Sequence, residues 1–189
     1  MPSLEQSLIY QALRDISRSI EDFELFIETG TLVGETSAMA STIFKQVYTI
    51  EVYEPLYCAA LERFKNSNVT PMHGDSISTL PLLLDSTNKS TIFWLDGHNS
   101  GPGTGVGQID FPLLAECTAI DNHFTGKEAL ILIDDVRLFG KGHSAEIDNS
   151  LKSLTVQQVL EVFKKRSISR YAHYDSELAP DDRLAIHIV

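Results

Sequence analysis

Residues 26–36 read Phe26-Ile27-Glu28-Thr29-Gly30-Thr31-Leu32-Val33-Gly34-Glu35-Thr36. A short apolar run ends here in a turn that carries two glycines, and the start of a helix follows. Gly30 allows a sharp turn and a close approach of the backbone to a ligand, and Gly34 relieves packing near the helix. The glycines have GxxxG spacing rather than the dinucleotide fingerprint GxGxxG, which disfavours an NAD-dependent oxidoreductase. Taken alone, the turn is as typical of a structural turn as of a ligand site.

Short apolar runs alternate with amphipathic stretches along the rest of the chain, which is typical of an α/β sheet. Five runs predict strands buried on both faces, at 24–27, 47–50, 69–72, 91–95 and 129–133. The last two predicted strands have too short a link for a parallel crossover and are expected to pair antiparallel, at 170–174 and 183–189. These ranges predict a mostly parallel seven-stranded sheet with a terminal antiparallel pair and helices on both faces.

Helices are predicted between the strands and before the first one. Ser3 and Gln6 have the spacing of a helix capping box, and apolar residues recur every four positions after them. Residues 1–22 are therefore expected to form an amino-terminal helix that covers the sheet or the substrate site. Pro55 suits the first turn of a further helix, and Thr155 suits the cap of another.

The composition bounds the class of protein. The 189 residues carry 15 basic and 26 acidic side chains, a formal net charge of −11, and 43% are hydrophobic, which predicts a single domain over 1–189. The acidic balance disfavours nucleic-acid binding, which draws its affinity from clustered Lys and Arg. Without a signal sequence or a long apolar stretch, the chain is expected to be cytoplasmic and to make no membrane contact. Cys58 and Cys117 have no disulfide or zinc spacing and are expected to be reduced, buried thiols.

Polar residues follow the second and third predicted strands where each of them ends. Glu51 lies 23 residues after Glu28, near the spacing at which a carboxylate meets ribose hydroxyls in nucleotide-binding α/β proteins. Gly74, Asp75 and Ser76 follow the third strand, and the carboxylate suits an exocyclic amine. Because open parallel sheets bind ligands at this edge, the residues predict a nucleotide-like pocket. Alone, the third segment is more typical of a solvated turn.

The fourth and fifth predicted strands end in acidic residues. Asp96 and His98 share one side of an extended backbone, and Asp134 and Asp135 end the neighbouring strand. A buried cluster of carboxylates is costly without protons or a cation, so these residues predict a divalent metal, with magnesium favoured by hard oxygen ligands. The alternatives are that Asp96 faces the cofactor, Asp134 caps a helix and Asp135 is solvated.

Taken together, these segments resemble the class I S-adenosylmethionine-dependent methyltransferases, with their Rossmann-like fold. The resemblance implies that the turn at Glu28 holds the amino acid part of the cofactor, Glu51 the ribose and Asp75 the adenine. Leu32 stands where the commoner family motif has a second glycine. The resemblance implies the following cofactor-binding residues: Glu28, Thr29, Gly30, Thr31, Gly34, Thr36, Glu51, Val52, Gly74, Asp75, Ser76 and Asp96.

The acidic cluster resembles that of the metal-dependent, macrocin-type O-methyltransferases, which implies magnesium on Asp96, Asp134 and Asp135. The lysine that catechol-type relatives carry three residues after the first aspartate is replaced by Asn99. Asp96 and His98 are the candidate catalytic residues. His98 titrates near neutrality and suits a general base, or a partner that orients Asp96. Lys141 and His143 are weaker candidates for the base.

The glycine-rich stretch 97–109 is too long for a simple connection and is expected to form a mobile lid. Its small residues favour a polar acceptor such as a sugar hydroxyl. The sequence thus predicts metal-assisted O-methylation of a small hydroxylated molecule, with S-adenosylmethionine as cofactor and a homodimer as a plausible assembly. The alternatives are another metal-carboxylate enzyme on the same fold, or a cofactor-binding module without catalysis.

Overall fold

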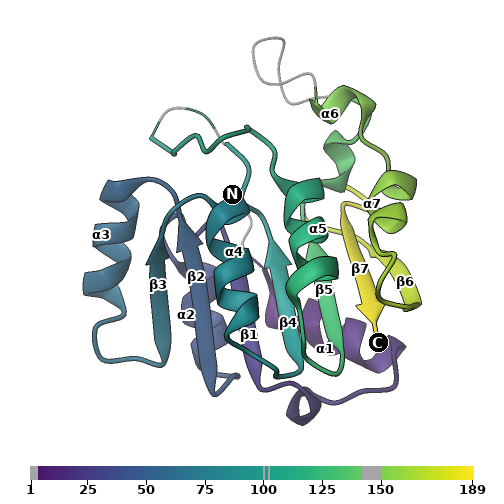
Figure 1. The fold of residues 1–189 in the computed structure, drawn as a ribbon, viewed down its shortest axis with the longest axis horizontal. Coiled ribbons are helices and arrows are strands. Elements are labelled where there is room, and N and C mark those ends of the chain that lie inside the picture. Colours follow the sequence, from purple (N-terminus) through teal and green to yellow (C-terminus); the bar gives the residue numbers. More distant parts are fainter. Residues whose placement is uncertain (1–3, 100, 102, 142–149) are drawn as a thin grey trace.

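A computed structural model describes residues 4–99, 101, 103–141 and 150–189, and their strands form one sheet (Figure 1). The sheet has seven strands in the order β3-β2-β1-β4-β5-β7-β6. The strand bounds are β1 Leu25–Thr29, β2 Gln46–Glu51, β3 Val69–His73, β4 Thr91–Leu95, β5 Ala129–Ile133, β6 Ile168–Tyr174 and β7 Arg183–Ile188.

The strand directions are those of the predicted fold. Strands β1 to β5 pair in parallel, whereas β7 runs antiparallel to both β5 and β6. This is the Rossmann-like methyltransferase fold, and the prediction of the fold class is confirmed. The parallel strands bring their carboxyl ends to one edge of the sheet, so segments far apart in sequence meet there.

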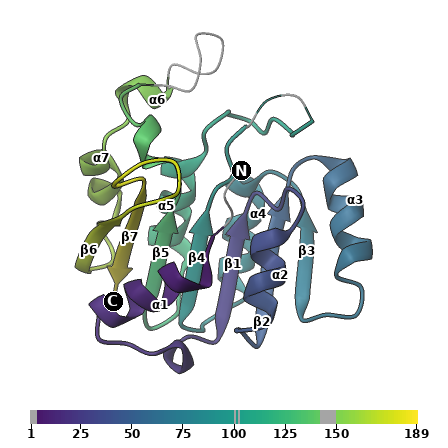
Figure 2. The ribbon, with the colours of Figure 1, turned by 180° about the vertical axis from the view of Figure 1, so that it is seen from behind.

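Helices cover both faces of the sheet (Figures 1 and 2). Buried side chains of α1, α2 and α3 pack on one face, and those of α4, α5 and α7 pack on the other. The helix bounds are α1 Gln6–Asp15, α2 Glu35–Ser41, α3 Glu54–Arg63, α4 Ser76–Asp85, α5 Leu113–His123, α6 Ser150–Ser153 and α7 Val156–Val162. The short 3-10 helices are η1 Ile20–Asp22 and η2 Val136–Leu138. Among the described helices, none is long and apolar enough to cross a membrane.

The central strands are apolar on both sides because both sides face helices. Phe26 packs toward α1 and α2, while its neighbours Leu25 and Ile27 pack toward α4 and α5. Strand β3 differs from its prediction, since Val69 is buried but Thr70 is exposed and the rest is at most half-buried. It forms an edge of the sheet, where one side of the strand has no neighbouring strand to cover it.

Two further predictions are corrected by the helices. The amino-terminal helix ends at Asp15, short of the expected range 1–22, and it covers the sheet. Its cap position is Glu5, whereas Ser3 of the predicted capping box lies outside the described residues. Cys58 is exposed, while Cys117 is buried as predicted. The predicted cap at Thr155 is confirmed, because its side chain accepts a hydrogen bond from the Gln158 N–H.

Candidate active site

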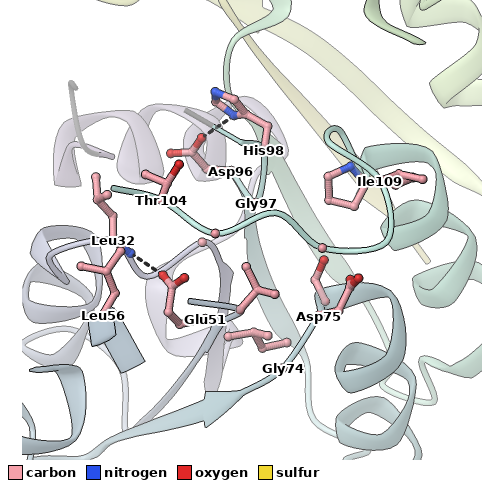
Figure 3. A pocket seen from close by; sticks show the side chains of 17 residues that line it. Leu32, Glu51, Leu56, Gly74, Asp75, Asp96, Gly97, His98, Thr104 and Ile109 are labelled. Carbon is pink, nitrogen blue, oxygen red and sulfur yellow. Dashed lines mark hydrogen bonds and ion pairs between the residues drawn. The ribbon is translucent and has the colours of Figure 1, made fainter. Parts of the chain in front are cut away.

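A pocket opens at the carboxyl edge of the sheet, where β1, β2, β3 and β4 end (Figure 3). The floor comes from the turns after these strands, and the wall opposite comes from the loop that connects β4 to α5. The lining residues are Gly30, Leu32, Ile50, Glu51, Val52, Leu56, Gly74, Asp75, Ser76, Asp96, Gly97, His98, Thr104, Gly105, Gly107, Ile109 and Pro112.

Gly30 fits its place because it has no side chain and tolerates left-handed backbone. Its φ is +84°, and a Cβ there would overlap the carbonyl oxygen of Asp96. Its N–H donates to the carbonyl of Ile50 over 2.9 Å, which ties the first turn to the second strand. The glycine therefore lets the ends of β1, β2 and β4 approach one another around the pocket.

We expect Gly30→Ala to destabilise the protein, because the added Cβ would meet the carbonyl oxygen of Asp96. The matched control is Gly140→Ala, because Gly140 also has a positive φ of +76° but meets no atom of a non-adjacent described residue within 4 Å of the added Cβ. Left-handed strain costs both variants about 1–2 kcal/mol, and only Gly30→Ala adds a backbone overlap. Urea unfolding of both variants measures the difference. Equal losses of the free energy of unfolding in the two variants would show that the turn at Gly30 relaxes to accept the Cβ.

Glu51 ties two turns of the pocket together. Its carboxylate accepts hydrogen bonds from the N–H groups of Leu32 and Tyr53, over 2.9 and 2.8 Å. Leu32 has a φ of +50°, so it keeps a glycine-like backbone at the position where the motif that this sequence resembles has a second glycine. The bond from Leu32 to Glu51 offsets part of that strain. A carboxylate has about four lone-pair positions, so Glu51 can still accept from two ligand hydroxyls.

Asp75 holds the loop between β4 and α5 against the pocket. One carboxylate oxygen caps α4 by accepting from the Ile77 N–H over 2.9 Å, and the other accepts from the Gln108 N–H over 2.5 Å. The Gln108 side chain also donates to the Ser78 hydroxyl over 3.1 Å. The described part of the predicted lid therefore contacts the Asp75 end of the pocket, and its mobility stays a prediction.

Several residues of the predicted cofactor set lie behind the pocket rather than in its lining. Glu28 is buried and accepts hydrogen bonds from the hydroxyls of Ser37 and Thr49. Burial raises the pKa of Glu28 from its ordinary value of 4.5 to about 8. The other predicted residues outside the lining are Thr29, Thr31, Gly34 and Thr36. Their contact with the cofactor stays a prediction, whereas Gly30, Glu51, Val52, Gly74, Asp75, Ser76 and Asp96 all line the pocket.

His98 joins the ends of β4 and β5. Its Nδ1 lies 3.3 Å from Asp96 and its Nε2 lies 3.1 Å from Asp135 (Figure 3 shows the first pair). Burial alone would lower the pKa of His98, but the hydrogen bond and charge of Asp96, with the charges of Asp135 and Asp134, raise it above the ordinary value. The histidine is therefore held by carboxylates on both sides at the rim of the pocket.

Asp134 and Asp135 have arginine partners that the sequence patterns did not reveal. Arg183 lies 3.3 Å from Asp134, and Arg137 contacts Asp135 and lies 2.8 Å from Asp182. Burial, followed by the charges of Asp96 and Asp135, raises the pKa of Asp134 from 3.8 to about 7. Each arginine lies within two residues of an aspartate in the sequence. That proximity could have revealed only the pair of Arg137 with Asp135, because Arg183 lies 49 positions from its partner Asp134 and Arg137 lies 45 positions from Asp182.

Glu116 of α5 is a buried carboxyl beneath the pocket that motif reasoning also missed. Its Oε1 and the hydroxyl of Thr29 have no hydrogen-bond partner among the described residues, and Gly97 leaves the space that both occupy. Burial raises the pKa of Glu116 from 4.5 to about 7. Glu116 is thus a third buried acid whose pKa is raised to near neutrality or above, besides Glu28 and Asp134.

Aromatic rings lie beside His98, although no Phe, Tyr or Trp is among the described residues that line the pocket. The Phe111 ring lies 5.7 Å from that of His98 and meets Phe139 edge-on at 6.2 Å. Phe139 follows β5 in the chain and comes beside the loop only through the fold. An acceptor beside His98 would therefore have an apolar neighbour as well as polar ones.

No family model matches this sequence, and no curated protein does. Solved structures share its fold. The N-methyltransferase NodS from Bradyrhizobium japonicum WM9 is 13% identical, with a TM-score of 0.58 over 97% of this chain and 94% of that chain. A TehB-like SAM-dependent methyltransferase from Corynebacterium glutamicum ATCC 13032 Kitasato is 13% identical, with a TM-score of 0.54 over 97% and 95%. An rRNA methylase from Streptococcus thermophilus is 13% identical, with a TM-score of 0.57 over 100% and 97%. At 13% identity these structural similarities show a shared fold alone, and the activity has to be argued from the site.

Proposed function

We propose that this protein is an S-adenosylmethionine-dependent methyltransferase that methylates a hydroxyl group of a small molecule. The observation that carries the proposal is the pocket, which places Gly30, Glu51 and Asp75 at the ends of three adjacent strands and His98 at its rim. Structural neighbours that include N- and rRNA methyltransferases support methyl transfer on this fold without selecting the acceptor atom. The choice of oxygen rests on His98, a base near the pocket for the proton of a hydroxyl.

The residues of the pocket suit separate parts of the cofactor. Glu51 would accept from the ribose hydroxyls, in addition to the backbone N–H groups that it already holds. Asp75 would accept from the adenine amine once the Gln108 N–H leaves one of its oxygens. The bound cofactor supplies a methyl group on a sulfonium, so the protein has only to align the acceptor oxygen and to remove its proton. His98 would take that proton at a ring nitrogen released from Asp96 or Asp135, each of which engages one of its two nitrogens.

Magnesium is predicted at Asp96, Asp134 and Asp135, but these carboxylates already pair with His98 or with arginines. Carboxylate oxygens suit a hard divalent cation, and Asp96, His98 and Asp135 offer atoms within 4.8 Å of one another. However, Asp134 pairs with Arg183, and Asp135 contacts both Arg137 and His98. As arranged, the carboxylates do not fit a divalent cation, and no step of the proposed reaction uses one.

The remaining predictions concern the acceptor, the location and the oligomeric state. The net charge of −11 favours a small acceptor over a nucleic acid, as the sequence predicts. A cytoplasmic location and a homodimer also stay predictions.

Calorimetric titration tests the cofactor first, because it needs no knowledge of the acceptor. We expect S-adenosylmethionine and S-adenosylhomocysteine to bind with micromolar Kd. Absence of binding by either compound would contradict the proposal and would leave another reaction type on this fold.

A second test addresses the base. Small hydroxylated compounds are screened for formation of S-adenosylhomocysteine, and the best acceptor is compared between wild type and His98→Ala. We expect turnover to fall about 10²- to 10⁴-fold with unchanged cofactor affinity, and to fall most at low pH, where the acceptor hydroxyl ionises least on its own. A loss that is equal at every pH would assign His98 an orienting role instead.

A further inference from the structure

We infer that Arg137 and Arg183 supply the positive charge that a divalent cation would bring to this site, so that the acidic cluster is complete without metal. The inference rests on the proposed function only for the role of His98, since the charge arrangement itself belongs to the folded protein. Four carboxyl groups gather at the ends of β4 and β5 and at the start of β7: Asp96, Asp134, Asp135 and Asp182.

Arg183 is fixed beside Asp134. Its guanidinium Nε lies 3.3 Å from the carboxylate, and the side chain is only 3% exposed. The guanidinium also lies over the ring of Trp94, 5.7 Å from its centre. The arginine is therefore buried between Asp134 and Trp94, where its charge opposes that of a cation approaching Asp134.

Arg137 bridges Asp135 and Asp182. It contacts Asp135, and its Nη1 lies 2.8 Å from Asp182, which is fully buried. Asp182 also accepts from the Arg137 backbone N–H over 3.1 Å and from the Ser176 hydroxyl over 2.5 Å. Arg137 is thus held at both its main chain and its side chain by one buried carboxylate.

This bridge fixes the position of Asp135. The backbone of Asp135 has a φ of +60°, which is rare for a residue other than glycine and persists only where neighbouring residues enforce it. The following residue, Val136, donates its N–H to the carbonyl of Asp182 over 2.8 Å. With one oxygen on Arg137 and the other 3.1 Å from His98, Asp135 has both oxygens engaged. Arg137 is therefore a positioning residue for the pair of Asp135 and His98.

A divalent cation would meet two obstacles here. It would have to displace guanidinium groups from Asp134 and Asp135, and it would then sit beside charges of its own sign, which disfavours binding. Removing one arginine leaves one guanidinium group fewer to displace and one positive charge fewer to repel the cation. The arrangement therefore predicts weak metal binding by wild type and stronger binding after loss of Arg137.

The experiment titrates the full-length protein with Mn²⁺ and follows the free ion by electron paramagnetic resonance. Wild type, Arg137→Ala and Arg18→Ala are compared. Arg18 is the control because it pairs with a single carboxylate, Glu128, over 3.0 Å in another part of the molecule. We expect no binding below millimolar Mn²⁺ for wild type and Arg18→Ala, and a Kd at least about tenfold lower for Arg137→Ala, a change that corresponds to one unit of log Kd.

Micromolar Mn²⁺ binding by wild type would overturn the inference whatever the variants do, and so would a folded Arg137→Ala that binds no better. Thermal unfolding verifies that each variant is folded. If Arg137→Ala is unfolded, Arg137→Gln takes its place, because it keeps a hydrogen-bonding side chain without the charge. Titration of the same samples with S-adenosylhomocysteine tests the proposed function separately, since the cofactor pocket can fail while the metal result stands.

Discussion

Glu51→Ala is expected to lower the affinity for S-adenosylmethionine about 100-fold. Hydrogen bonds to a charged group contribute about 1.5–3 kcal/mol each, so loss of two ribose contacts corresponds to about 3 kcal/mol or more. The same carboxylate holds the N–H groups of Leu32 and Tyr53, so the turn proposed to contact the cofactor also loses support. Calorimetric titration of the variant measures the loss.

Two further variants separate binding from folding. Glu51→Gln keeps the size of the side chain and one carbonyl acceptor, and we expect a smaller loss of affinity than with alanine. Glu62→Ala removes an exposed carboxylate from α3 and serves as the control, with affinity equal to wild type. Unchanged affinity of a folded Glu51→Ala would refute the ribose assignment.

The free energy of unfolding of the wild type is expected to fall as the pH rises from about 5 to 8. Burial raises the pKa of Glu28 from 4.5 to about 8, and those of Glu116 and Asp134 to about 7. In this window the unfolded chain has released these protons and the folded protein retains them, so the folded state binds more protons. Their stabilising effect is complete below the ordinary pKa and is lost as the pH rises through the raised one. A tenfold difference in proton affinity between the folded and unfolded states corresponds to about 1.4 kcal/mol. The free energy of unfolding is therefore expected to fall by several kcal/mol over this pH range.

Glu28→Gln tests the largest of these contributions. The amide is neutral at every pH, so we expect the variant to match wild type near pH 4 and to be more stable than wild type, by about 1 kcal/mol or more, above pH 8. Glu24→Gln replaces an exposed carboxylate next to the same strand and serves as the control. Urea unfolding across the pH range measures both. A pH profile of Glu28→Gln that parallels wild type would contradict a retained proton on Glu28.

The same variant tests a prediction from the sequence. Glu28 belongs to the predicted cofactor set, but it lies behind the pocket and bonds Ser37 and Thr49. Its position favours an unchanged cofactor affinity in Glu28→Gln, whereas a direct contact with the cofactor requires a loss.

The fold was predictable because its signals are local. The runs at β1, β4 and β5 are buried at every position, and a strand covered by helices on both sides requires a nearly continuous apolar run. The edge position of β3 was not predictable, because Val69 and its neighbours have strand character wherever the strand lies in the sheet. The number of neighbours that a strand has is a property of the assembled sheet.

The candidate site was predictable in part for the same reason. Residues that follow parallel strands meet at one edge, which brings Glu51, Asp75 and Asp96 into one pocket. The approach of Gln108 to Asp75 depends on the path of a long loop, and no local pattern encodes that path. Whether a predicted residue faces the pocket or the interior behind it, as Glu28 does, also depends on the packing of the assembled sheet.

By itself, then, the sequence determined the strands, their direction and the acidic groups at their ends, since hydrophobic period and the lengths of the links between strands are properties of the chain. Only the tertiary structure decided which charges compensate one another. Arg183 reaches Asp134 across 49 positions of sequence, and Arg137 reaches Asp182 across 45. Electrostatic compensation depends on distance in space, and the antiparallel pairing of β7 with β5 sets these distances.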